Sequence, residues 1–414
     1  MPFLEFVADV VLASLLGVTA LDAVLVFIHK NPVTVTRKWN ERFNLGETNK
    51  ISLHVQNNGN QPLHFILFEG FPVEMQERSK SYNGLITGGG KKEFTYTFTP
   101  KRRGVFTFDD ITIRIRSVFF LVSRRIEIEA KGEFHVYPSV LQMKKYELLV
   151  FHQQKVNSGI KKIRRLGNNS EFEQIKNYVQ GDDLRTVNWK ATSRKNELMV
   201  NQYQEEKSQS IYCIIDKSRN MEMDFEGLSF LDYSINATLV LSNIAIKKGD
   251  KAGLITYSDK IGTMLPADRS AGQMRRMVEA LYNQRTRFKE ASYDLLYQSI
   301  RRSVRSRSLI VLFTNFESEF SLKRALPILR QINQKHVLVV VMFENKELQD
   351  QAFGTSTSLM EVYQATVAER MISYKTKMAQ TLRQNGIHTV LTLPEDLSVN
   401  TINKYLELKA KGAI

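Results

Sequence analysis

A short run of charged and aromatic residues near the middle of the chain could carry out chemistry. Two adjacent carboxylates follow a glycine, and two arginines and a tryptophan follow the carboxylates. A forked guanidinium can hold a carboxylate with two hydrogen bonds, and a nearby tryptophan gives such a pair an apolar wall. The run predicts a catalytic or recognition carboxylate pair or, as the favoured interpretation, a polar clasp that joins the two halves of the chain, because no nucleophile or metal-ligand set accompanies the acids. The adjacent carboxylates are also expected to cap the next helix. Its members are Gly181, Asp182, Asp183, Arg185, Trp189 and Arg194.

A second group of polar residues follows two apolar runs in the carboxy-terminal half. Ile211–Ile215 and Leu309–Phe313 have the continuous apolar character of buried strands. Binding sites in parallel sheets lie at the carboxyl ends of the strands, so we expect the residues after these runs to form an exposed binding edge. These residues are Asp216, Lys217, Ser218, Arg219, Asn220, Thr314 and Asn315. The cations of this group, with Lys260 and Arg269, would make the edge basic and predict an acidic docking surface on a partner.

Helical stretches alternate with short apolar runs over residues 208–414. This alternation predicts a mainly parallel sheet covered by helices on both faces, which is a doubly wound α/β domain. No GxGxxG sequence follows the first run, which argues against a dinucleotide enzyme. The expected strands are Ile211–Ile215, Ala252–Tyr257, Leu309–Phe313, Val337–Phe343 and His388–Leu391.

Residues 33–140 have the pattern of an all-β module. Ile51–Val55, Phe94–Phe98 and Ile111–Ile115 alternate apolar and polar side chains, as half-buried strands do. Turn sequences such as Gly88–Gly90 separate the runs and let the chain reverse. We therefore expect a small antiparallel β-sandwich.

Residues 141–207 connect the two modules and contain the carboxylate motif. Glu171–Tyr178 has helical spacing and is expected to form a helix that stops at Gly181. The basic pairs Lys161–Lys162 and Arg164–Arg165 could contact nucleic acid or anionic lipid. Lipid is favoured, because no aromatic residues are interleaved with these charges as in a base-stacking platform.

Residues 1–30 are long and apolar enough to form a membrane-anchoring helix. The charged residues before position 29 are Glu5, Asp9 and Asp22, and a bilayer core needs about 20 mostly apolar residues. A buried helix of a soluble core is the alternative, disfavoured because no later segment is comparably apolar. Basic residues follow the apolar run, which predicts that the soluble domains face the cytoplasm at the inner membrane of the cell.

Composition excludes several classes of protein. The chain has 414 residues, a formal charge of +15 and 43% hydrophobic residues. This composition excludes a disordered chain, a collagen-like chain and a disulfide scaffold, and the length predicts two or three compact units. The single cysteine, Cys213, can form no internal disulfide, which favours a reducing compartment. The basic stretch Arg301–Arg307 is interpreted as a solvated helix face.

The carboxylate motif resembles a known family. Gly181–Lys190, together with Pro100–Gly104 and Val136–Pro138, is similar to the domain of unknown function 58 family. The resemblance covers most of the chain and implies an N-terminal membrane segment, a strand-rich region, the Gly-Asp-Asp-x-Arg motif and a von Willebrand factor A-like domain. Two residues depart from the family pattern, Asn188 and Ser193, where Asp and Ala are common. Family members usually have two membrane helices, whereas we find one.

The A-like domain implies a metal-ion-dependent adhesion site, built from a DxSxS loop after the first strand and a Thr and an Asp from later loops. Magnesium prefers six oxygen ligands. Asp216 and Ser218 match the loop, whereas Asn220 and Asn315 stand at two ligand positions and Ser292 is the nearest substitute for the threonine. We expect a degenerate site that keeps its binding face without its ion. No cofactor is expected, and magnesium on Asp216 and Ser218 is the alternative.

The family is linked with MoxR-type AAA+ ATPases, so the resemblance implies an adaptor or target of such an ATPase in assembling envelope complexes. We expect a membrane-anchored, non-catalytic protein-interaction module, because the chain has no Walker motif. One alternative is a metal-dependent hydrolase that uses Asp182 and Asp183, although HExxH and GxSxG sequences are missing. The other is a basic nucleic-acid-binding protein, but nucleic acid is not an expected partner.

Overall fold

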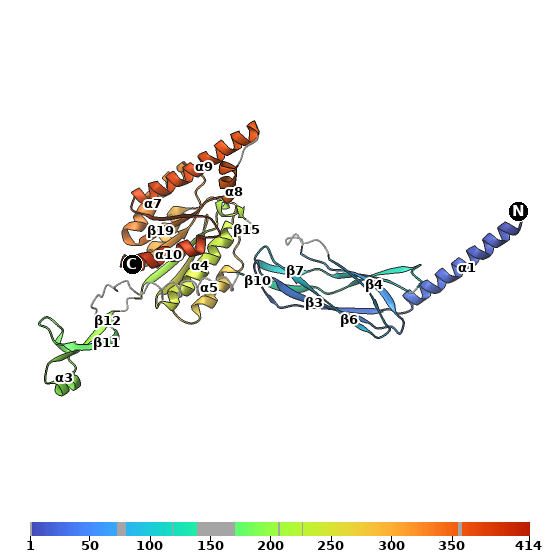
Figure 1. Cartoon of the computed structure of the whole chain (residues 1–414), viewed down its shortest axis with the longest axis horizontal. Helices are drawn as coiled ribbons and strands as arrows, with labels where there is room; N and C mark the ends of the chain where they lie inside the picture. The colour runs from blue at the N-terminus through green and yellow to red at the C-terminus, as the bar shows by residue number, and fades with distance from the viewer. Residues whose placement is uncertain are drawn as a thin grey trace. The chain divides into compact units, whose positions relative to one another are not determined.

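The computed structural model describes residues 2–72, 80–117, 119–138, 170–205, 208–225, 227–354 and 358–414. Its chain divides into two compact units, Met1–Ser139 with Tyr282–Gln284, and Val140–Leu281 with Arg285–Ile414. The first unit holds a helix and a β domain, and the second holds a β-hairpin and an α/β domain (Figure 1). The basic pairs Lys161–Lys162 and Arg164–Arg165 lie outside the described residues.

Helix α1, Pro2–Phe27, confirms the expected N-terminal apolar helix. Within the described part of the chain, its stretch Phe6–Phe27 is the one helical segment long and apolar enough to cross a membrane. Only 11% of that stretch is buried, so the helix is not a core element of the β domain. Membrane anchors and signal sequences both have such a helix.

The β domain is built from three small sheets, with strand orders β1-β3-β6, β2-β10-β7 and β5-β4-β8-β9. Neighbouring strands are antiparallel except β10 and β2, which run parallel, a detail that local alternation does not reveal. The strands are β1 (Val33–Lys38), β2 (Arg42–Asn44), β3 (Asn49–Asn57), β4 (Leu63–Phe68), β5 (Ser81–Ile86), β6 (Lys91–Phe98), β7 (Gly104–Phe108), β8 (Ile111–Arg116), β9 (Ser123–Ile128) and β10 (Gly132–Tyr137). The prediction of a β domain from the period of two is confirmed.

Aromatic side chains fill the core of the β domain. Phe43, Phe98, Phe108 and Phe134 are fully or almost fully buried, and the rings of Phe108 and Phe134 lie 4.4 Å apart. Such rings bury large apolar areas and prefer tilted or edge contacts of this kind. The alternating burial of β1 and β3 follows from one strand face packing on this core while the other meets solvent.

The α/β domain contains a six-stranded sheet in the order β17-β16-β13-β18-β19-β20. Five strands are parallel, and β17 is an antiparallel edge strand. Each expected apolar run forms a strand, which confirms the doubly wound α/β domain. The strands are β13 (Ser210–Asp216), β16 (Lys251–Tyr257), β17 (Ile261–Asp268), β18 (Leu309–Phe313), β19 (Val337–Phe343) and β20 (His388–Thr392), with the short pair β14 (Asp224–Phe225) and β15 (Leu228–Ser229) beside them.

Helices cover both faces of this sheet. The helix α4 begins with a capping box, in which the side chains of Ser229 and Asp232 each accept from the other's backbone N–H. The helices are η3 (Arg219–Met221), α4 (Phe230–Lys247), α5 (Gln273–Leu281), α6 (Tyr293–Ser303), α7 (Glu319–Lys335), α8 (Lys346–Phe353), α9 (Leu359–Gln384) and α10 (Leu397–Ala410). The arginines after Ile300 are exposed at the end of α6, as expected for a solvated face.

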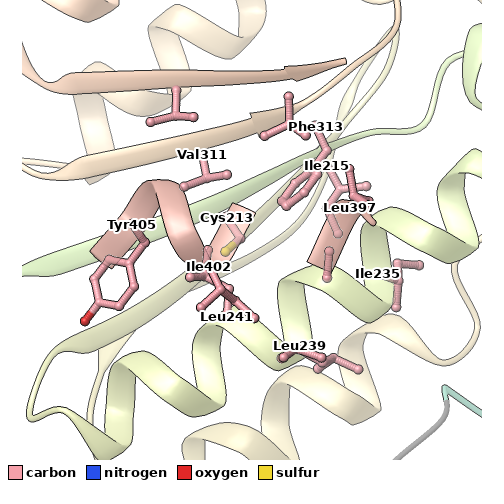
Figure 2. Close-up of a cluster of buried hydrophobic side chains, with 14 of the residues drawn as sticks. Cys213, Ile215, Ile235, Leu239, Leu241, Val311, Phe313, Leu397, Ile402 and Tyr405 are labelled. Atoms are coloured by element: carbon pink, nitrogen blue, oxygen red, sulfur yellow. The ribbon is translucent and has the colours of Figure 1, made fainter. Parts of the chain in front are cut away.

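Alternate residues of each central strand point to two separate cores. Cys213 and Ile215 face the helices α4, α5 and α10, and Figure 2 shows them beside Ile235 and Ile402. Ile214 belongs to the other core, formed with α6, α7 and α9. Because both faces are covered, the strands are apolar without alternation, which is why they were recognisable in the sequence.

Candidate functional site

Asp216 and Thr314 meet at the carboxyl end of the parallel sheet. Their strands, β13 and β18, are neighbours that pair up to Ile215 and Phe313. Asp216 Oδ2 accepts a hydrogen bond from Thr314 Oγ1 at 2.7 Å, and its Oδ1 accepts from the backbone N–H of Ser218 at 2.7 Å. The expectation that the strand ends bring these side chains together is confirmed.

The same side chains are not exposed, so the expectation of an open binding edge is wrong for most of them. The exposed fractions are 1% for Asp216, 1% for Ser218, 0% for Thr314 and 6% for Asn315. Arg219 is exposed, and Lys217 and Asn220 are half-buried.

The burial has a cause in the loop that precedes α6. Arg287 donates its N–H to the carbonyl of Lys217 at 2.7 Å, and Arg219 donates its N–H to the carbonyl of Lys289 at 3.2 Å. Lys217 in turn donates its N–H to the carbonyl of Tyr257 at 2.7 Å. These backbone bonds hold neighbouring loops against the one that carries Asp216. The sequence analysis did not identify this covering loop, because the loop between α5 and α6 lies about 70 residues from Asp216 in the sequence.

Two tyrosines complete the buried polar cluster. The hydroxyl of Tyr293, at the start of α6, lies 3.1 Å from Thr314 Oγ1, and its ring makes an edge contact with Tyr257 at 6.0 Å. Burial raises the pKa of both phenols, so they stay neutral. Burial also raises the pKa of the Asp216 carboxyl, against the hydrogen bonds from Thr314 and Ser218. Neither tyrosine was predicted, and Ser292, the expected substitute for a threonine, instead donates its backbone N–H to the carbonyl of Ser258.

A lysine from α9 reaches the other side of the site. Lys375 Nζ donates to Asn315 Oδ1, and Asn220 Nδ2 donates to the carbonyl of Asn315 at 3.1 Å. Burial lowers the pKa of Lys375 to about 8, although Glu317 and Glu344 act in the opposite direction. Lys375 lies some 60 residues along the chain from Asn315, and no local motif could have identified it.

The oxygen donors of the site fit a divalent cation poorly. Asp216 supplies one carboxylate, and Ser218 Oγ is a buried oxygen without a hydrogen-bond partner, which a cation could satisfy. However, the described residues contain no cluster of three or more His, Cys, Asp or Glu side chains that could hold a metal. Asn315 Oδ1 also accepts from a lysine amine, which opposes a nearby dication. The function proposed below therefore involves no metal ion at this site.

The predicted basic edge is only partly assembled. The Arg219 guanidinium is paired with Glu317 at 3.1 Å, which reduces its net charge. Lys260 lies in the turn after β16, on the same side of the sheet as Asp216. Arg269 follows the antiparallel strand β17, and Asp268 pairs with Ala252 at the start of β16. The assignment of Arg269 to the basic edge was therefore wrong, because an antiparallel strand ends at the opposite side of the sheet from its parallel neighbours.

The carboxylate motif lies on a β-hairpin and not after a helix. Ser170–Asn177 is strand β11, which pairs antiparallel with β12, Met199–Glu205. The helix expected over Glu171–Tyr178 was wrong, since pairing with a partner strand outweighed the local spacing. Gly181 adopts a φ of 113°, which suits glycine and turns the chain toward the short helix η2, Leu184–Thr186.

The two carboxylates hold the turn together. Asp182 accepts from Lys176 Nζ at 2.8 Å and from the N–H of Val179 at 3.0 Å. Asp183 Oδ1 accepts from the N–H of Arg185 at 3.0 Å and so caps η2. Lys176 lowers the pKa of Asp182 through its hydrogen bond. These contacts hold a local turn of the hairpin, with a lysine and backbone N–H groups as donors. They do not form the expected clasp, in which arginine side chains were to join the two halves of the chain.

The remaining motif residues are arranged around helix α3, Trp189–Lys195. Asn188 caps this helix by accepting from the N–H of Ala191 at 3.0 Å, a role that Asp also performs. Trp189 is 73% exposed, so it does not wall a carboxylate–arginine pair. Arg194 lies in the last turn of α3, where a cation is favourable to the helix dipole.

Comparisons with known proteins agree with this division of the chain. Residues 174–361 match the family described as "Protein of unknown function DUF58", and residues 38–130 match "BatD DUF11 like domain". "Uncharacterized protein YeaD" from Bacillus subtilis (strain 168) is 24% identical over 166 residues, which are 40% of this chain and 39% of YeaD. The chain thus matches about two fifths of the length of that relative.

Two solved structures are similar to parts of the chain. BatB from Bacteroides thetaiotaomicron has 13% identity and a TM-score of 0.35, covering 49% of this chain and 100% of BatB. The CARDB domain of a Pyrococcus furiosus protein has 16% identity and a TM-score of 0.19, covering 25% of this chain and 86% of that domain. The match over residues 174–361, which include the Gly-Asp-Asp-x-Arg motif and the first strands of the α/β domain, assigns this region to the DUF58 family, and a BatD-like region precedes it.

Proposed function

We propose that this protein is a membrane-anchored, non-catalytic protein-interaction module that binds its partner through helix α9. The proposal keeps the expected class of function and moves the binding surface, because the strand-end site around Asp216 is buried. The proposed anchor is α1, with the soluble domains in the cytoplasm at the inner membrane. The uncovered apolar face of α9 is the observation that carries the proposal.

Helix α9 has an apolar stripe along most of its length. At about 100° per residue, six large apolar residues of its first part lie within an arc of about 120°. They are exposed to different degrees: Leu359 90%, Met360 64%, Tyr363 66%, Val367 37%, Met371 50% and Tyr374 50%.

The same stripe is buried in the second part of the helix. Met378 and Leu382 lie on the same side of α9 and belong to the core of the α/β domain, with exposed fractions of 2% and 0%. The end of α9 beside α8 projects past the sheet (Figure 1). A solvent-facing helix end needs no apolar stripe, and contiguous exposed apolar patches mark interaction surfaces in soluble proteins. The stripe therefore supports docking of a protein with an apolar surface.

The stripe is next to the strand-end site. Tyr374 ends it, and the following residue, Lys375, contacts Asn315. Half-buried Lys217 and exposed Lys260 add positive charge on the same side of the sheet. A partner that covers the stripe can thus also meet these cations, which supports an acidic rim around its apolar contact.

We further propose that the partner is a MoxR-type AAA+ ATPase, for which this protein is an adaptor or target in assembling envelope complexes. The family resemblance supports this identity. Any ATP hydrolysis would belong to the ATPase, since this chain has no Walker motif.

Capture of the purified ATPase by the full chain tests the proposal. Tyr363→Ser combined with Met371→Ser is expected to weaken capture at least about tenfold, because truncating a central interface anchor costs about 2 kcal/mol. Leu295→Ser, on α6 and 38% exposed, is the matched control and should bind normally. Wild-type capture by the double variant would refute α9 as the binding surface.

Capture at low and high salt concentration distinguishes the apolar contribution to binding from the electrostatic one. The apolar contact of α9 should persist in high salt, whereas the contribution of Lys217 and Lys260 should weaken as their charges are screened. Equal capture at low and high salt would remove the basic edge from the proposal. If the ATPase is not captured at all while another protein is captured through Tyr363, the partner identity fails and the binding surface stands.

A further inference from the structure

One end of the β domain is attached directly to the last turns of α1. The N–H of Val122 donates to Asp22 Oδ2 at 2.7 Å, and Asp22 is fully buried. The guanidinium of Arg124 donates to the carbonyl of His29 at 2.8 Å and to that of Lys30 at 3.1 Å. These bonds fix the start of β9 beside the helix and explain how an aspartate is accommodated near the end of an apolar segment.

Three large apolar residues are exposed immediately before this attachment. Phe119 is 55% exposed, Phe120 is 50% exposed and Leu121 is 49% exposed. Connections between strands are usually rich in small polar residues, which water solvates. Phe120 also has a φ of 60°, an uncommon value for a bulky residue, and its ring lies 4.4 Å from the ring of His64. The conformation costs free energy, and about half of the surface of each of the three residues stays exposed to solvent.

Strand register places these residues among cations. Arg116, the last residue of β8, pairs with Ser123, the first residue of β9. Arg116 also pairs with His64, which pairs with Leu85 of β5, an apolar residue that is 48% exposed. The hairpin after β5 leads to Lys91 and Lys92, which pair with the last residues of β3. We call the group of Lys91, Lys92, Arg116 and Arg124 the basic collar; the next arginine, Arg125, is paired with Glu127 at 2.9 Å.

We propose that Phe119–Leu121 inserts into the membrane interface beside α1, with the basic collar against anionic lipid headgroups. The inference rests on the membrane-anchor part of the proposed function and adds a second membrane contact to it. Asp22 lies five residues before Phe27, a rise of about 7 Å along the helix. Interfacial apolar side chains penetrate roughly 5–10 Å into the headgroup and acyl boundary. A loop bonded to Asp22 is therefore at the depth that such side chains occupy.

The positive charge of the basic collar favours anionic lipid as the binding partner of this loop. Polybasic groups close to a membrane segment are attracted to the anionic inner leaflet. The loop is also held beside α1, because Val122, the residue after Leu121, donates its N–H to Asp22 of the helix. Two contacts, the helix and the loop, would restrict rotation of the β domain relative to the bilayer.

Site-specific fluorescence tests the inference in the full chain reconstituted into lipid nanodiscs. The native cysteine, Cys213, is fully buried, and burial raises the pKa of its thiol to about 12, so it should not react with a maleimide at neutral pH. Leu121→Cys can thus be labelled alone with a polarity-sensitive dye. The matched control is Thr48→Cys, an exposed position at the opposite end of β3. At about 3.3 Å per residue, nine residues put it roughly 30 Å from the loop end of the sheet.

The expected result is a blue-shifted dye at position 121 that lipid-attached quenchers reach and an aqueous quencher does not. The dye at position 48 should behave in the opposite way. Phe119→Ser combined with Phe120→Ser should return the dye at position 121 to water. Lys91→Gln combined with Lys92→Gln should reduce shielding in phosphatidylglycerol nanodiscs and leave it unchanged in pure phosphatidylcholine.

A third probe separates this inference from the anchor itself. A dye at Val18→Cys, in the middle of α1, must be shielded by lipid if α1 is a membrane anchor. Shielding at position 18 with full water exposure at position 121 would overturn the loop insertion and leave the anchor intact. Exposure at both positions would overturn both. Exposure at position 121 in nanodiscs but shielding in native membranes would overturn lipid as the occupant and indicate a protein instead.

Discussion

Replacing Asp216 with asparagine distinguishes a neutral buried carboxyl from an ion ligand. The two side chains have nearly the same size, so packing at the end of β13 should be retained. Asp216 is 1% exposed, and its oxygens accept hydrogen bonds from Thr314 Oγ1 and the N–H of Ser218. The side-chain oxygen of asparagine can still accept the hydrogen bond from the N–H of Ser218. Its NH2 group can donate to Thr314 Oγ1, whose hydroxyl hydrogen can rotate away.

The expected magnitude follows from burial. Because burial raises the pKa of the Asp216 carboxyl, the folded state holds its proton more tightly than the unfolded state does. The stability contributed by this proton is present at low pH and is lost as the pH rises from the ordinary value of 3.8 through the raised folded value. At pH 8 Asp216→Asn should therefore be more stable than the parent by about 1–3 kcal/mol, the order of the desolvation cost of a buried group, because asparagine does not titrate. The difference should shrink at acidic pH.

Thiol labelling of Cys213 provides a local assay. This single cysteine lies in β13 with no exposed surface, so its labelling by excess reagent in graded denaturant reports opening of the α/β domain alone. A local probe is needed because the chain has two compact units and a global signal would mix their transitions. Thr314→Val is the control, expected to lose about 1–3 kcal/mol because it leaves an acceptor oxygen of Asp216 unsatisfied.

Loss of stability in Asp216→Asn at pH 8 would refute this reasoning. Magnesium provides the second half of the experiment, since a ligand that binds only the folded state adds about 2.7 kcal/mol at a hundredfold excess over its dissociation constant. If magnesium or manganese stabilises the parent and not the variant, and calorimetry shows micromolar binding that Asp216→Ala abolishes, the site holds an ion and the expectation of a degenerate site is wrong.

Three further changes test the packing of the two units. Arg37→Met should lower the stability of the β domain by about 3–5 kcal/mol in denaturant unfolding, because it leaves the buried Glu69 carboxylate, 2.7 Å away, without its partner; the added Glu69→Leu should recover most of the loss, and no recovery would contradict the pairing. Ser229→Ala should cost the α/β domain about 1 kcal/mol by removing the cap of α4, and an unchanged midpoint would show that the cap is redundant. Burial lowers the pKa of Lys375 to about 8 from 10.5, so between these values the unfolded chain binds more protons and stability should rise with pH. Lys375→Met should remove that rise, and an identical pH profile would assign it to other groups.

Elements with a strong local pattern were predictable from the sequence. The apolar runs of β13, β18 and β19 were recognisable because both faces of a central parallel strand are buried, which leaves no polar alternation. The failed prediction is instructive for the same reason. Glu171–Tyr178 has helical spacing, yet most of it forms β11, because β12 pairs with it along its length apart from a bulge between Phe172 and Gln174. A strand partner more than twenty residues away leaves no trace in a local window.

The family motif was assigned to the correct residues and only partly to the correct contacts. Its carboxylates were expected to cap the next helix, and Asp183 does so, because a glycine with positive φ followed by acids favours capping locally. The clasp expected between the two halves of the chain is instead a local turn. Their donors were not predictable, because the position of Lys176 depends on the hairpin register. The exposure of Trp189 was not predictable either, because the residue type does not show whether neighbouring elements cover its ring.

The sequence alone determined which residues meet at the sheet edge, since parallel strands end on one side and place Asp216 beside Thr314. Only the tertiary structure decided that this edge is closed, because segments distant in sequence, the loop containing Arg287 and the helix carrying Lys375, cover and contact it. Exposure of the α9 stripe was likewise undecided, since a helix needs the same apolar spacing to fill a core or to bind a partner. Spacing is a local property, whereas burial depends on everything that packs around a side chain.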